Sequence, residues 1–161
     1  MSNSMPLSKP ALLTALLFFL FPASAFAQAA KCPVSEIPLS IKGAKIGASK
    51  IILKDGAKTE NVMSWYKPML IRHGDGSACL VDPDVSIITQ PVFSAGGRIL
   101  YVTTYSGSLS VIYAVNIHDC GVLWHSPTFT GSPVRHGSRL RIAGAPDVVI
   151  GPSCLPLPAG K

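Results

Sequence analysis

The sequence predicts an all-β protein, a small antiparallel sandwich or barrel of about seven or eight short strands stabilised by disulfides. Short β-branched or aromatic runs recur about every ten residues, with Gly, Pro or Asp turns between them. The chain has 161 residues with 14 glycines, 14 prolines and no heptad repeat, which excludes a coiled coil. It is 48% hydrophobic and only 14% charged, which excludes disorder and fits one globular domain.

Residues 1–27 have the layout of a secretory signal peptide. Lys9 gives a positive start, residues 11–21 form an apolar run, and Ala25-Phe26-Ala27 is a small-x-small cleavage site. A membrane span needs about 20 apolar residues, so we expect a cleaved leader rather than an anchor or a buried helix. No later run of apolar residues is long enough to predict a transmembrane helix. We therefore expect one β-rich secreted domain over residues 28–161, in the periplasm or the extracellular space.

Four cysteines follow the expected leader: Cys32, Cys79, Cys120 and Cys154. An even number in an exported chain predicts two disulfides. Three connectivities are possible, and the sequence does not choose among them. The sequential pairing of Cys32 with Cys79 and of Cys120 with Cys154 is the simplest. The alternative, a cysteine-based zinc site, lacks a C-x-x-C pair, so we predict no metal.

The expected elements follow from alternating apolar residues and turn signals. An extended lead-in covers 28–40, and a Pro-rich, exposed tail covers 152–161. Residues 59–67 fit a short helix or a strand. The expected strands are 49–54, 69–72, 78–81, 85–89, 99–105, 111–117 and 122–124, with a hairpin turn at 73–77. Residues 139–143 and 148–150 give one or two more strands.

The register of the strands 111–117 and 122–124 depends on the turn between them. A two-residue turn sets Ile117 against Val122 and Val115 against Trp124. A three-residue turn instead sets Val115 against His125. The apolar pattern favours the first register, because a shift by one residue exchanges the two faces of a strand.

The same region carries a resemblance to a known family. The run 97–102, the turn Ser106-Gly107, the strand Tyr113-Ala114-Val115 and the segment 120–124 together resemble one blade of a quinoprotein-type β-propeller. A propeller needs at least four blades, and the chain holds no second copy of the pattern. The resemblance therefore implies a similar local shape alone, with no quinone or metal site.

The histidines do not form a predicted metal site. In the favoured register, His118 and His125 lie on rungs about 13 Å apart, too far for one ion to bridge. His136 lies in a loop between Pro and Gly, and His73 lies beside the hairpin turn. We predict neither a metal nor another cofactor.

Catalytic motifs are also missing. The chain has no G-x-S-x-G and no S-x-x-K motif. Cys79 with His73 would imitate a thiol–base pair, but a disulfide is favoured in an exported chain. The remaining enzymatic hypothesis is a small secreted hydrolase that uses His73 with Asp75 or His118 with Asp119.

Positive charge is the remaining feature. The chain has 14 Lys and Arg residues against 8 Asp and Glu residues, a net charge of +6. An exported basic protein can contact an anionic envelope component or an acidic protein, whereas the export signal argues against nucleic acid. The alternative is that the lysines only protect strand edges from aggregation. The candidate basic binding surface comprises Lys42, Lys45, Lys50, Lys54, Arg135, Arg139 and Arg141.

By elimination, the sequence predicts an exported non-catalytic binding protein. Its partner would be a protein or an anionic envelope component, as for a periplasmic inhibitor or an immunity-type protein. The alternatives are the small secreted hydrolase and a structural subunit of the cell envelope.

Overall fold

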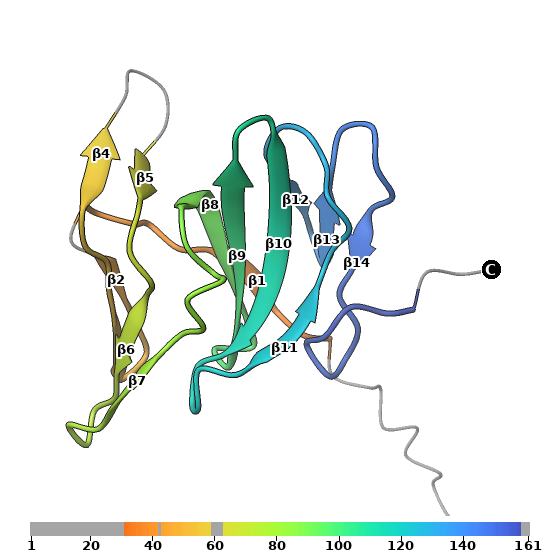
Figure 1. Cartoon of the computed structure of the whole chain (residues 1–161). Helices are drawn as coiled ribbons and strands as arrows, with labels where there is room; N and C mark the ends of the chain where they lie inside the picture. The colour runs from red at the N-terminus through yellow and green to blue at the C-terminus, as the bar shows by residue number, and fades with distance from the viewer. Residues whose placement is uncertain (1–30, 42, 59–62, 159–161) are drawn as a thin grey trace, which may run out of the picture.

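The computed structural model describes residues 31–41, 43–58 and 63–158, so the expected leader lies outside the described residues. These residues form fourteen β-strands and no helix (Figure 1). The strands form three sheets in which all pairs are antiparallel. The all-β prediction is therefore confirmed, while the predicted number of strands is wrong.

The central sheet has seven strands in the order β11-β10-β9-β8-β5-β4, and β1 also pairs with β8. Its middle is a meander of long strands joined by short turns. The strands are β1 (Val34–Glu36), β4 (Gly56–Lys58), β5 (Met63–Trp65), β8 (Ile88–Ala95), β9 (Ile99–Ser106), β10 (Leu109–Asn116) and β11 (Val122–His125).

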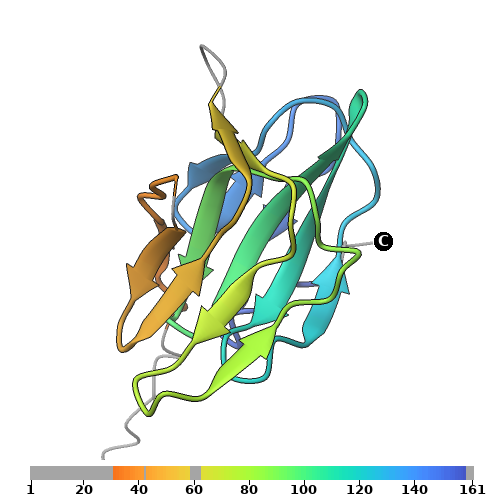
Figure 2. The ribbon, with the colours of Figure 1, turned by 60° about the vertical axis from the view of Figure 1, so that its left-hand side comes forward.

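Two smaller sheets lie on opposite faces of the central sheet (Figures 1 and 2). The four-stranded sheet has the order β2-β3-β6-β7, with β2 (Gly43–Ile46), β3 (Ser49–Ile52), β6 (Leu70–Arg72) and β7 (Ala78–Leu80). The three-stranded sheet has the order β12-β13-β14, with β12 (Val134–His136), β13 (Arg139–Arg141) and β14 (Val148–Val149).

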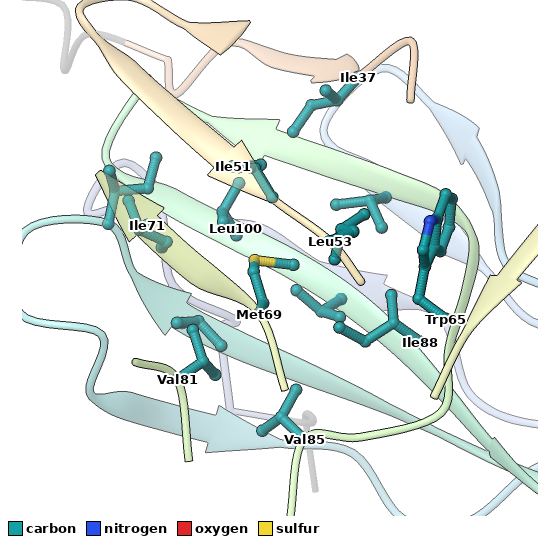
Figure 3. Close-up of a cluster of buried hydrophobic side chains, with 14 of the residues drawn as sticks. Ile37, Ile51, Leu53, Trp65, Met69, Ile71, Val81, Val85, Ile88 and Leu100 are labelled. Carbon is teal, nitrogen blue, oxygen red and sulfur yellow. The ribbon is translucent and has the colours of Figure 1, made fainter. Parts of the chain in front are cut away.

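The first hydrophobic core lies between the four-stranded sheet and the central sheet (Figure 3). Ile51 and Ile71 point inward from β3 and β6 and pack in one cluster with Leu100 of β9. Trp65 is fully buried in this cluster, and its indole N–H donates a hydrogen bond of 2.9 Å to the carbonyl of Ile41. This polar contact satisfies the one donor of a side chain that otherwise only packs.

The second hydrophobic core lies on the other face of the central sheet. Phe93, Tyr101 and Ile112 pack there against Leu140 and Val148 of the three-stranded sheet. The central strands are therefore buried on both faces. This explains why β9 begins with an uninterrupted apolar run instead of an apolar and polar alternation.

The two predicted disulfides are present, but the simplest pairing is wrong. Cys32 is bonded to Cys154, and Cys79 is bonded to Cys120. Cys32 precedes β1, which pairs with β8, and Cys154 packs with Cys32 in the second core. Cys79 on β7 reaches the turn after β10 and so joins the four-stranded sheet to the central sheet. Two disulfides are compatible with an oxidising compartment.

Several strands were absent from the sequence prediction. The lead-in contains β1, β2 lies between the lead-in and the first expected strand, and the loop expected around His136 contains β12. Within the segment 59–67, for which a helix or a strand was expected, residues 63–65 form the strand β5, and residues 59–62 lie outside the described residues. The Pro-rich tail folds back, since the N–H of Leu157 donates to the carbonyl of Val149.

The favoured register of β10 and β11 is also wrong. Val115 is paired with Val122 and Ala114 with Trp124, with a bulge between Ala114 and Val115. The loop is longer than two residues, because the N–H of Asn116 donates to the carbonyl of Gly121 and closes residues 117–120. This longer loop shifts the ladder and leaves Ile117 outside it.

Candidate functional site

A row of three cations crosses the outer face of the four-stranded sheet. Lys45 is paired with Lys50, and Lys50 is paired with Arg72. Paired residues of an antiparallel ladder project to the same side. Their neighbours Ile51 and Ile71 point into the first core, so the three cations point outward, and all three are exposed. We call Lys45, Lys50 and Arg72 the cationic row.

The cationic row has no carboxylate partner in the described part of the chain. The one ion pair found among those residues joins Lys67 and Asp55, 2.8 Å apart and exposed. The Asp55 carboxylate accepts a hydrogen bond from Lys67 and raises the pKa of that ammonium group. Like charges placed directly opposite each other destabilise a ladder, so the row costs stability instead of adding it.

An apolar row runs beside the cationic row on the same face. Ile52 is paired with Leu70, and Leu70 is paired with Leu80. Ile52 and Leu70 are half-buried, while the Leu80 side chain is 58% exposed at the open edge of the sheet. The face therefore combines three positive charges with an accessible apolar strip.

The remaining predicted lysines add less to this face. Lys54 is exposed and follows the end of β3, outside the ladder. Lys42 lies outside the described residues. Arg72 was missing from the predicted set. Arg72 is at the end of the predicted strand 69–72, and this was its only signal in the sequence. Its position opposite Lys50 follows from the pairing of β3 with β6, which the sequence does not show.

The predicted arginines lie on the other side of the molecule. Arg139 is paired with His136 and Arg141 with Val134, all exposed on the outer face of the three-stranded sheet. Arg135 is paired with the buried Leu140, so it projects from the opposite side of β12. Because the two smaller sheets cover opposite faces of the central sheet, the two basic clusters form separate surfaces.

Two of the histidines lie close together beside a disulfide. The rings of His73 and His118 have centroids 6.0 Å apart, and Nε2 of His73 lies 3.8 Å from Sγ of Cys79. The disulfide between Cys79 and Cys120 brings them together. Cys79 is oxidised in this disulfide, so the thiol–base pair is wrong. The described residues contain no group of three His, Cys, Asp or Glu side chains that could hold a metal ion.

The Asp residues of the hydrolase hypothesis hold their own turns. Asp75 Oδ1 accepts hydrogen bonds from the backbone N–H and the hydroxyl of Ser77, at 2.9 and 2.7 Å, and these bonds lower the pKa of its carboxyl. Asp119 Oδ1 accepts one from the N–H of Gly121. Ser49 lies 3.3 Å from Nδ1 of His73, but the other nitrogen of that ring faces the Cys79 sulfur. In a catalytic nucleophile–base pair, a third polar group normally binds the second ring nitrogen of the histidine and orients the ring. In His73 this second nitrogen faces a disulfide sulfur instead.

The fold and the cationic face define a small disulfide-bonded all-β protein with a basic outer sheet. The chain matches no protein-family model, no curated protein and no solved structure. The described residues also hold no helix that is long and apolar enough to cross a membrane.

Proposed function

We propose that this chain is an exported, non-catalytic binding protein that recognises an acidic protein surface through the outer face of the four-stranded sheet. The observation that carries the proposal is the cationic row, with Lys50 held between Lys45 and Arg72. Proteins retain locally unfavourable features mainly at functional sites. Three neighbouring cations that repel one another are therefore expected where a binding partner supplies negative charge.

The apolar row favours a protein over an anionic polymer as the partner. Protein interfaces combine an apolar centre with charged groups that steer the encounter. A charged polymer would use the three cations but would leave the exposed Leu80 unused. The two disulfides and the expected leader support a location in the periplasm or the extracellular space, where an inhibitor or an immunity-type protein would act.

The test compares two variants that lose the same charge. One replaces the cationic row, as Lys45→Gln, Lys50→Gln and Arg72→Gln. The matched control replaces the second cluster, as Arg135→Gln, Arg139→Gln and Arg141→Gln. Each variant and the wild-type chain, with disulfides intact, would be used to capture partners from envelope and secreted extracts at low and moderate salt.

We expect a single stoichiometric protein partner for the wild type and the control, and its loss in the variant of the cationic row. Equal loss in both variants would mean attraction by net charge alone and would contradict the proposal. Capture of anionic polymer that disappears at moderate salt would contradict the choice of a protein partner. Stable self-association at micromolar concentration would support the structural-subunit alternative instead.

A further inference from the structure

A hollow of about 600 Å³ lies at the end of the central sheet that holds the turn between β9 and β10. This turn is at the top in Figure 1. Its volume is in the range of small-ligand sites. Ser64 of β5 is paired with Thr89 of β8, and Tyr105 of β9 with Ser110 of β10, and all four line it. We call this hollow the hydroxyl cleft.

The hydroxyl cleft lies on the face of the central sheet that carries the second core. Tyr105 is four residues from Tyr101 along β9, and Ser110 is two residues from Ile112 along β10, so each pair shares a face. This face is apolar where the three-stranded sheet covers it. Towards the end of the strands it changes to hydroxyl groups, and there it forms the cleft.

Among the described residues, the side chains that line the cleft are mostly hydroxylated and uncharged. Of the ten described residues that line the cleft, seven carry a hydroxyl group and none is ionic: Ser64, Tyr66, Thr89, Tyr105, Ser106, Ser110 and Ser132. A hydroxyl both donates and accepts hydrogen bonds. Such a lining matches a ligand that is itself neutral and hydroxylated, whereas a charged ligand would meet no opposite charge among the described lining residues.

Two tyrosines give the cleft exposed aromatic surface. The side chains of Tyr66 and Tyr105 are 55% and 45% exposed. Tyrosine offers a large, rigid and amphipathic contact surface at a low entropic cost. The flat C–H face of a sugar ring can pack on such a ring while the sugar hydroxyls bond to the exposed hydroxyl groups of Ser106 and Ser132.

The cleft also contains a strained residue. Ile87 has a φ of 54°, a conformation that a β-branched residue adopts only at a cost. Its carbonyl accepts a hydrogen bond of 3.0 Å from the N–H of Tyr105, which holds the backbone of both residues in place. The strained residue is therefore bonded through its backbone to one of the two tyrosines of the cleft.

We propose that the hydroxyl cleft binds a short neutral saccharide. A bound peptide strand is less suitable, because it requires an open strand edge for backbone hydrogen bonds. The cleft lies instead on a sheet face, where the backbone groups of β8, β9 and β10 already bond within the ladder. The proposal does not depend on the cationic row, which lies on the outer face of another sheet.

The test is a titration of the isotope-labelled chain, followed by the NMR signals of its backbone amides. The probes are cellotriose, maltotriose and the N-acetylated chitotriose at millimolar concentration, with the charged trimer of galacturonic acid as a comparison. We expect saturable shifts at cleft residues with at least one neutral probe. Tyr105→Ala should weaken that binding about tenfold or more, because the stacking surface is lost.

Two further variants keep the result interpretable. Leu109→Ala removes an exposed apolar side chain beside the cleft that does not line it, and it should bind like the wild type. Tyr105→Phe keeps the ring and should retain most of the affinity. Absence of shifts with all three neutral probes would overturn the proposal. Unchanged affinity in a folded Tyr105→Ala variant, or stronger binding of the charged trimer, would overturn it as well.

Discussion

Lys45 on β2 and Lys50 on β3 are directly opposite each other in an antiparallel ladder, with both side chains exposed. Arg72 on β6 extends the same row on the other side of Lys50. Lys50 therefore has a cation on each side. We expect the row to lower the stability of the free protein, and an acidic partner to relieve the repulsion.

Replacement of the middle cation should stabilise the protein. Lys50→Gln removes two like-charge cross-strand pairs, whose repulsion we expect to be of the order of a favourable cross-strand pair, about 0.2–1 kcal/mol each. We expect a higher free energy of unfolding by urea at low salt, and a smaller gain as salt screens the wild-type repulsion. Lys54→Gln, which removes an exposed lysine outside the ladder, is the control and should change little. A loss of stability at low salt in the Lys50 variant would show that the row is not repulsive.

The two disulfides should differ in their contribution to stability. Cys79 and Cys120 are 41 residues apart in the sequence, whereas Cys32 and Cys154 are 122 apart. The chain-entropy argument gives about 4 kcal/mol for the shorter loop and about 5 kcal/mol for the longer one. Urea unfolding of the double alanine variants measures both. We expect the larger loss without the Cys32–Cys154 bond, and the reverse order would contradict this account.

The order of the strands explains which parts of the fold the sequence predicts. Local hairpins such as β6 with β7 follow from turn residues between apolar runs, and the structure contains them. The pairing of β1 with β8 and of β3 with β6 joins segments that are distant in the sequence, and no local pattern reports it. Lys45 and Lys50 of the cationic row were therefore predicted, but Arg72 and the separation of the basic residues into two clusters on opposite sides of the molecule were not.

A buried tyrosine links the central sheet to the C-terminal disulfide. The hydroxyl of Tyr101 donates a hydrogen bond of 2.8 Å to the carbonyl of Cys154, and burial raises the pKa of this phenol. Tyr101→Phe should lower the free energy of unfolding by about 1–3 kcal/mol, because a buried carbonyl loses its donor. Tyr105→Phe changes an exposed phenol and should stay within about 0.5 kcal/mol of the wild type in the same urea titration. Equal effects of the two changes would argue against a structural role for the Tyr101 hydroxyl.

The hairpin turn between β6 and β7 should be sensitive to acid. The hydroxyl and the backbone N–H of Ser77 hold the pKa of the Asp75 carboxyl below its ordinary value of 3.8. Because the pKa is lower in the folded state, the ionised Asp75 carboxyl stabilises the turn at pH values above that ordinary value. This stabilisation is lost as the pH falls through the lower pKa of the folded state. Ser77→Ala removes the largest cause, so the pKa of Asp75 should rise. An NMR titration of the Asp75 carboxyl carbon measures it, and an unchanged pKa would refute the assignment.

The most direct test of the binding face uses a photo-cross-linking amino acid at two matched positions. Ala78 on the edge strand β7 is exposed and paired with Arg72, at the end of the cationic row. Val134 on the edge strand β12 is exposed and paired with Arg141, on the opposite outer face. We predict that position 78 cross-links to an acidic segment of one envelope or secreted protein and that position 134 does not. Cross-linking from position 134 alone, or none from position 78, would contradict the account.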